Sequence, residues 1–374
     1  MARLARGEYL DPQRIQIVHA TQRCVRRAFL CGNDPLSGKS FEHRRQWIRD
    51  RLEFLASVFG IDCLTFSVMN NHLHLILRSR ADVVRQWSDE QVARRWLRLF
   101  PRRRLPDGQP AEPDQAELTT LLHDPGRLAE LRIRLSDISW WMRCTCEVIA
   151  RQANREDQCR GHFWEGRYRA QMITDTASLL ACAMYVDLNP IRAAMADTPE
   201  ASRFTGAKER LDDWRQERTP TATAKQTGKR PVAKRGRSGK NSHRWERRGQ
   251  GVYSGWMSPL EINEKSDPVG ADASPDGRRA SCKGFLPLSL GHYLQLLDWT
   301  GRQLRADKPG LIPADLAPIL QRLGLDTANW CELVLRFGRL FKRVAGGPPA
   351  IAAEAKRRGQ NWMQAPGAAL ISAA

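Results

Sequence analysis

Two histidines stand one residue apart in FSVMNNHLHLILR, residues 66–78, a segment that otherwise has the composition of a buried β-strand. Side chains alternate between the two faces of a strand, so the leucines at alternate positions share one face, and His72 and His74 lie on the other. Two imidazoles on one face could hold a metal ion. Such a pair is more often a partly exposed strand surface, so it needs a partner elsewhere in the chain.

The partner is the segment ACAMYVDLNPIRAAM, residues 181–195, which is expected to be helical as far as Asn189 because Pro190 disfavours helix at the residue before it. Tyr185 and Asn189 are four residues apart and would face the same way on a helix. Each pattern alone is common, since tyrosine is often part of a core and asparagine before proline is an ordinary cap. The two segments together are the specific feature.

The net charge indicates a polyanionic partner. Lys and Arg number 60 against 41 acidic residues in 374, a formal charge of +19. Each contact between a cation and a phosphate gains Coulomb energy and releases counterions, so nucleic acid is the expected ligand. No apolar run is long enough to span a bilayer or act as a signal peptide, which predicts a cytoplasmic protein without a membrane partner, bound to the nucleoid when it binds DNA.

The hydrophobic pattern predicts an α+β fold for residues 1–205. A strand around Ile17, a helix ending at Gly60, two strands joined by a turn at Asn70–Asn71, and a helix capped by Asp175 or Thr176 follow one another. Residues 87–134 contain PRRRLPDGQPAEPDQ, rich in proline and charge, and are expected to be an irregular insertion outside the core.

Composition changes beyond residue 205. Residues 224–250 hold ten Lys or Arg and one Glu with almost no apolar side chains, so residues 206–283 are expected to form a basic, largely disordered linker. Helical periodicity returns in three later stretches. Residues 284–374 are therefore expected to form a small all-helical C-terminal domain.

Four segments resemble the REP-associated tyrosine transposases, within the single-tyrosine HUH nucleases. They are TQRCVRRAF, FSVMNNHLHLIL, GHFWEGRYRA and YVDLNPIRAAM, in the family's order and rough spacing over about the first 200 residues. Asn70 departs from the pattern, because relatives commonly carry proline there, and a turn accepts either. The resemblance implies a ferredoxin-like antiparallel sheet with helices on one face.

The resemblance also implies a chemistry. His72 and His74 would bind one divalent metal, Asn189 would be its third ligand, and Tyr185 would attack the scissile phosphate and become joined to the 5′ end of DNA. A tyrosine hydroxyl with a pKa near 10 is a poor nucleophile at neutral pH, so the metal would supply charge. Imidazoles suit Mn²⁺, and a weakly held ion shared with a phosphate could also be Mg²⁺.

Four further residues are expected to contact DNA. Arg167, Tyr168 and Arg169 combine charge with an aromatic ring, a composition suited to single-stranded DNA, although each could equally be an ordinary exposed strand residue. Arg192 follows Asn189 by about one helical turn and could contact a phosphate. The expected partner is single-stranded or hairpin DNA, and the chain could act as a monomer or as a homodimer.

Two other functions fit parts of the sequence. A non-catalytic DNA-binding regulator on the same fold would explain the charge and the basic linker, but would have no use for a tyrosine beside a metal site. A zinc-dependent hydrolase would need an acidic residue near the histidines to activate water, and a third histidine or a cysteine at suitable spacing, and the sequence has neither.

Overall fold

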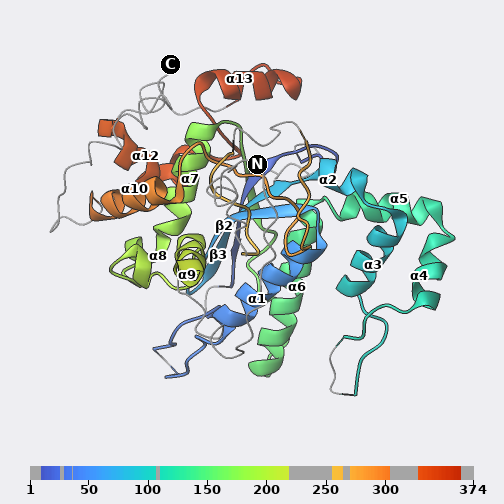
Figure 1. Cartoon of the computed structure of the whole chain (residues 1–374). Helices are drawn as coiled ribbons and strands as arrows, with labels where there is room; N and C mark the ends of the chain where they lie inside the picture. Colours follow the sequence, from blue (N-terminus) through green and yellow to red (C-terminus); the bar gives the residue numbers. More distant parts are fainter. Residues whose placement is uncertain are drawn as a thin grey trace, which may run out of the picture.

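A mixed five-stranded β-sheet lies at the centre of the protein in this computed structural model (Figure 1). The structure describes residues 10–25, 29–35, 37–106, 110–218, 255–263, 270–303 and 327–363. The strands are β1 (Ile17–Arg23), β2 (Ile61–Val68), β3 (His72–Ser79), β4 (Arg169–Ile173) and β5 (Val344–Ala345). Their order is β2-β3-β1-β4-β5, and each neighbouring pair is antiparallel except β4 and β5.

Helices connect and surround the strands in the described residues. They are α1 (Arg44–Val58), α2 (Ala81–Gln86), α3 (Asp89–Leu99), α4 (Gln115–Leu122), α5 (Pro125–Arg134), α6 (Ile138–Glu156), α7 (Thr176–Asp187), α8 (Asn189–Arg192), the 3₁₀ turn η2 (Pro199–Ala201), α9 (Gly206–Arg218), α10 (Leu290–Gln303), α12 (Thr327–Leu340) and α13 (Pro348–Arg357). The expected α+β class is confirmed.

Both faces of the sheet are covered by helices. The three leucines of β3 pack with α1 and α6 in one core, as the alternation predicts, whereas Ile76 packs with α7, α10 and α12 in a second core. Helix α7 is apolar on nearly all sides because the sheet and α12 enclose it. The prediction of helices on one face is therefore wrong, because α7, together with α10 and α12, covers the face on which Ile76 follows the histidines.

Residues 87–134 are not irregular, because they fold into α3, α4 and α5, which extend from the right side of the body in Figure 1. Helix α3 starts with a capping box between Ser88 and Gln91, and α4 starts with one between Asp114 and Glu117. These helices pack on one another and α3 packs on α1, with Leu97, Leu118 and Leu131 buried. Local capping and an apolar stripe thus make these segments helical, although a proline-rich loop separates α3 from α4.

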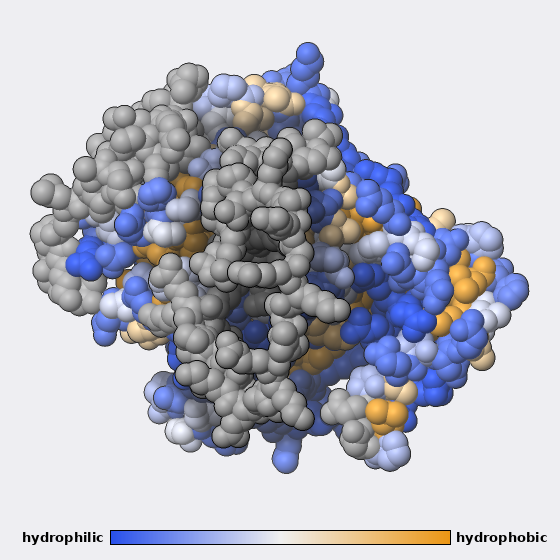
Figure 2. All heavy atoms as spheres, viewed as in Figure 1, coloured by the Kyte–Doolittle hydropathy of each residue, from blue (hydrophilic) through white to orange (hydrophobic). Residues whose placement is uncertain are grey.

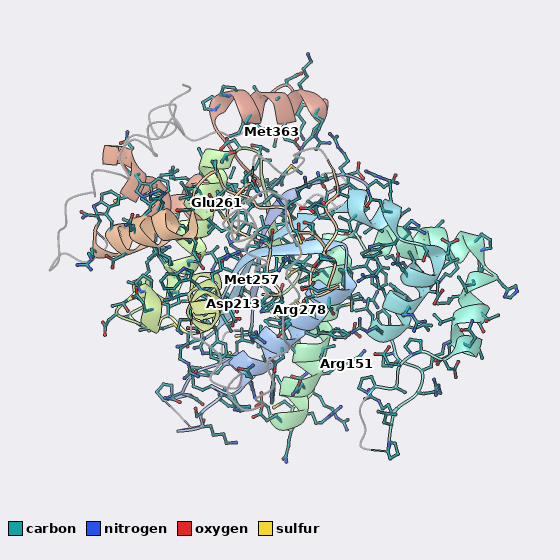
Figure 3. All side chains as sticks on the ribbon, viewed as in Figure 1. Arg151, Asp213, Met257, Glu261, Arg278 and Met363 are labelled. Carbon is teal, nitrogen blue, oxygen red and sulfur yellow. The ribbon has the colours of Figure 1, made fainter. Side chains whose placement is uncertain are left out.

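The segments after residue 205 also depart from the predicted organisation. Residues 206–218 form α9, and residues 255–263 and 270–283 pack on the body, where the buried carboxylate of Asp62 accepts from Arg78 and from the Ser281 hydroxyl. Figure 3 labels Met257 and Arg278 in this stretch. These residues are therefore folded, contrary to the prediction for this part of the linker; residues 219–254 and 264–269, which include the basic segment 224–250, lie outside the described residues, and for them disorder remains a prediction.

Residues 284–363 contribute more than helices. The strand β5 pairs with β4, so the prediction of an all-helical C-terminal region is wrong, and the parallel pair makes the sheet mixed rather than antiparallel. Helices α10 and α12 pack against the core around α7. The boundaries of the three predicted domains remain a prediction.

The described helices include none that is long and apolar enough to cross a membrane. The face shown in Figure 2 is mainly hydrophilic, with small apolar areas between polar ones.

Candidate active site

A cavity of about 290 Å³ opens at the ends of β1 and β3. Its walls come from β1, β3, the start of β4 with the loop before it, and α7. The lining residues are Thr21, Gln22, Arg23, His72, His74, Glu165, Gly166, Arg167, Arg169 and Tyr185. The structure thus brings both predicted metal-binding histidines, the predicted nucleophile and two predicted DNA-contacting arginines into one cavity.

His72 and His74 lie on the same face of β3, with their ring centroids 4.7 Å apart. His72 Nδ1 is 2.6 Å from Oδ1 of Asn71, in the turn that precedes the strand. An amide oxygen only accepts hydrogen bonds, so His72 Nδ1 carries the proton and Nε2 keeps its lone pair. A histidine that donates through one ring nitrogen in this way is typical of metal ligands, which bind through the other.

His74 is oriented by a chain of two hydrogen bonds. Gln171 Oε1 on β4 lies 3.2 Å from His19 Nδ1 on β1, and His19 Nε2 lies 2.9 Å from His74 Nδ1. Because the Gln171 oxygen accepts, His19 Nδ1 carries the proton, His19 Nε2 accepts, and His74 Nδ1 donates. His74 Nε2 then has a lone pair, is buried, and has no hydrogen-bond partner among the described residues.

Burial keeps the three imidazoles neutral. It lowers the pKa of His19 to about 4 and that of His72 to about 4, where the positive charge of Arg23 adds to the effect. It holds the pKa of His74 well below the usual value, with further repulsion from His19 and His72. At pH 7 the rings are therefore uncharged, which is the form that binds metals.

The Nε2 atoms of His72 and His74 suit a weakly held metal ion that takes its other ligands from outside this pair. The described part of the chain has no group of three His, Cys, Asp or Glu side chains placed to hold a metal. His19 is a third histidine in the cluster, but its Nε2 is occupied by the bond to His74. Two Nε2 atoms thus leave the remaining positions to amide, phosphate or water oxygens.

Tyr185 is half-buried on α7 and packs against the histidine cluster. Its ring centroid lies 5.6 Å from that of His74 and 5.9 Å from that of His19, edge-on to both. The guanidinium carbon of Arg192 lies 4.8 Å from the ring centroid, a cation–π contact. Tyr185 also lines the cavity, so a phosphate bound there would lie beside this side chain.

Asn189 is the predicted ligand that the structure does not place at the cavity. Helix α7 ends at Asp187 and α8 spans Asn189–Arg192, so the backbone stays helical through Pro190 and the predicted end at Asn189 is wrong. The Asn189 side chain is buried, its Nδ2 has no hydrogen-bond partner in the described residues, and it is absent from the cavity walls. Its role as a third ligand remains a prediction.

The four residues predicted to contact DNA do not all lie at the cavity. Arg167 and Arg169 line the cavity, whereas Tyr168 is buried with its hydroxyl 3.0 Å from Ser139 Oγ on α6. Alternation along the extended chain turns Tyr168 away from the arginines. Its ring is therefore in the core and not available for base stacking, which corrects the prediction for Tyr168. Arg192 is exposed and donates to the Leu335 carbonyl on α12.

The sequence reasoning missed His19, Thr21 and Arg23. They occupy alternate positions on β1, with Thr21 opposite His74 and Arg23 opposite His72 in the antiparallel register. The alternation of polar and apolar residues in VHATQR indicates that these three side chains share one face of the strand. The pairing of β1 with β3, on which the cluster depends, could not be taken from that pattern alone.

No family model and no curated protein matches the chain. A solved structure of the REP-associated tyrosine transposase bound to a REP hairpin is similar to it, with 13% sequence identity and a TM-score of 0.32 over 62% of this chain and 100% of the other. The identity and the TM-score are both too low for this likeness to identify the family.

Proposed function

We propose that the protein is a metal-dependent single-stranded DNA endonuclease and strand transferase of the transposase type, acting through a covalent 5′-phosphotyrosine. The observation that carries this proposal is the shared cavity, in which Tyr185 lies edge-on to His74, whose Nε2 is buried and, among the described residues, without a partner. The motif resemblance supports it. The strand order β2-β3-β1-β4, with α1 and α6 as connections, is that of a ferredoxin-like fold.

Tyr185 is the proposed nucleophile. Its Oη attacks the scissile phosphorus, a new O–P bond forms, and the bond to the 3′ oxygen of the preceding nucleotide breaks. The hydroxyl of Tyr185 loses its proton and the departing 3′ oxygen gains one, so charge and atoms balance. Attack by a 3′-hydroxyl on the phosphotyrosine reverses the step, so rejoining requires no ATP.

His72 and His74 would hold the metal through their Nε2 atoms, with Asn189 as the proposed third ligand. Bound there, a divalent ion would act as a Lewis acid on the phosphate. Imidazole nitrogen favours Mn²⁺ and phosphate oxygen favours Mg²⁺, so the assay tests both ions. Asn71 and His19 keep the two ligand nitrogens free of protons.

The arginines of the cavity would bind the DNA backbone. Arg23 on β1 lines one cavity with Arg167 and Arg169, which lie just before and at the start of β4. Guanidinium groups bind phosphate through paired hydrogen bonds, so three of them favour a strand of phosphates over a neutral ligand. The proposed substrate is therefore single-stranded or hairpin DNA.

The test is cleavage of labelled oligonucleotides taken from the DNA that flanks the gene, with Mn²⁺ or Mg²⁺, followed by a denaturing gel. Wild-type protein should give a cleaved strand and a protein-linked strand. His72→Ala and His74→Ala should abolish both, while His123→Ala, which changes an exposed histidine at the end of α4, should not.

Full activity in the His72 or His74 variant would contradict the metal assignment. Binding of the oligonucleotides by wild-type protein without cleavage in either metal would instead favour the non-catalytic regulator.

A further inference from the structure

Helix α12 covers the side of Tyr185 that faces away from the sheet. Phe337 on α12 is fully buried, and its ring centroid lies 6.0 Å from that of Tyr185 and 6.5 Å from that of His19. Arg192, whose guanidinium lies over the Tyr185 ring, donates to the Leu335 carbonyl at 2.8 Å. A helix that follows Tyr185 only after a long stretch of chain therefore contacts the candidate nucleophile directly.

Gly338 on α12 lies beside the Tyr185 hydroxyl. A methyl group placed there would lie 3.1 Å from Tyr185 Oη and 3.5 Å from its ring carbon Cζ. The shorter distance is tighter than ordinary van der Waals contact. Glycine inside a helix is less favourable than alanine. Glycine thus occupies the position of α12 at which a side chain would crowd the Tyr185 hydroxyl.

We propose that α12 fixes the position of Tyr185 from outside the cavity and that Gly338 is a positioning residue, whose lack of a side chain leaves the clearance that the Tyr185 hydroxyl needs to lie where it attacks the phosphate. This inference rests on the proposed function, because the clearance matters only if the hydroxyl reacts. It also assigns a role to the region after residue 284, which the motif resemblance does not cover. A side chain at 338 would displace the hydroxyl from this position without reaching the arginines that line the cavity.

The test compares Gly338→Ala and Gly338→Leu in the full chain with the same changes at Gly291. Gly291 lies near the start of α10, is exposed, and would bring a methyl group no closer than 3.8 Å to Ser289 Oγ. Both glycines lie in helices, so each substitution changes helix propensity in the same direction. The Gly338 variants should form the covalent adduct about tenfold to a hundredfold more slowly, because small misplacements of reacting groups have effects of this size. Their affinity for single-stranded DNA should be unchanged.

A second measurement does not depend on activity. The five tyrosines can be replaced by 3-fluorotyrosine, and the ¹⁹F resonance of Tyr185 can be assigned with Tyr185→Phe. In protein without metal or DNA, Gly338→Ala should shift this resonance and Gly291→Ala should not. Gly338→Ala is the smaller change, so the comparison holds even if Gly338→Leu prevents folding.

The two proposals fail in different ways. Absence of adduct in the wild-type protein would contradict the proposed function, and the ¹⁹F shift would still test the contact. An adduct that forms as fast in Gly338→Leu as in wild type, or a Tyr185 resonance unmoved by Gly338→Ala, would overturn the role of α12.

Discussion

His19 Nε2 lies 2.9 Å from His74 Nδ1, and this bond determines which nitrogen of His74 keeps its lone pair. The bond joins two adjacent strands inside the buried cluster, and Gln171 fixes its direction from a third strand. His19, which is not itself expected to bind metal, therefore leaves Nε2 of His74 able to bind it.

Replacing His19 should weaken metal binding. In His19→Phe an aromatic ring still packs on Tyr185 and Phe337, but His74 Nδ1 keeps only the Thr21 hydroxyl, 3.3 Å away. A hydroxyl can donate as well as accept, so the proton of His74 is expected to move to Nε2. Mn²⁺ affinity should fall about tenfold to a hundredfold, the usual effect of losing such a partner. Electron paramagnetic resonance of free Mn²⁺ measures this without DNA or catalysis.

His19→Gln is the matched control, because the amide oxygen of glutamine can take the place of Nε2 and accept from His74. This variant should bind Mn²⁺ more tightly than His19→Phe. Equal affinity in wild type and His19→Phe would show that the hydrogen bond does not prepare His74.

Arg167 and Arg169 should each contribute a phosphate contact. Changing either to Gln should weaken binding of single-stranded DNA and reduce the slope of log affinity against log salt by about 0.7, the value for one contact on a single strand. Fluorescence anisotropy over a range of salt concentrations gives both quantities. Arg151→Gln is the control, since Arg151 is exposed on α6, outside the cavity walls (Figure 3). A slope that is the same in all three variants would contradict the contact.

The basic segment 224–250 should add affinity without specificity. Its ten Lys or Arg residues against one Glu predict non-specific contacts with phosphates. Deleting it should weaken binding to every oligonucleotide and flatten the salt dependence, and the cleavage position on a sequencing gel should stay the same. A shifted position would mean that the segment takes part in choosing the site.

The sequence predicted those features that depend on local pattern. The alternation of HLHLIL placed the histidines and leucines of β3 on opposite faces, and Asp175 caps α7, where its side chain accepts from the Ser178 amide. These outcomes depend on side-chain direction within one strand or one helical turn, which the residues themselves determine.

Features that depend on distant partners were missed or wrongly placed. Tyr168 stands between two arginines and has the composition of a binding residue, but the packing of α6 on the sheet puts it in the core. The contact between Gly338 and Tyr185 joins residues far apart in the chain, and no periodicity in either segment indicates it. The helices α3 to α5 were not predicted, because the segment between α3 and α4 is rich in proline and charged residues.

The central claim is that Tyr185 is the nucleophile, and the most direct test compares Tyr185→Phe with Tyr168→Phe. The Tyr185→Phe change keeps the ring that packs on His74 and His19 but removes the hydroxyl. Tyr168→Phe removes a hydroxyl that bonds Ser139 in the core, and it should leave cleavage in place. On a denaturing gel with labelled single-stranded DNA and Mn²⁺, Tyr185→Phe should bind DNA yet give no protein-linked band, and Tyr168→Phe should give one. A protein-linked band in Tyr185→Phe would contradict the account.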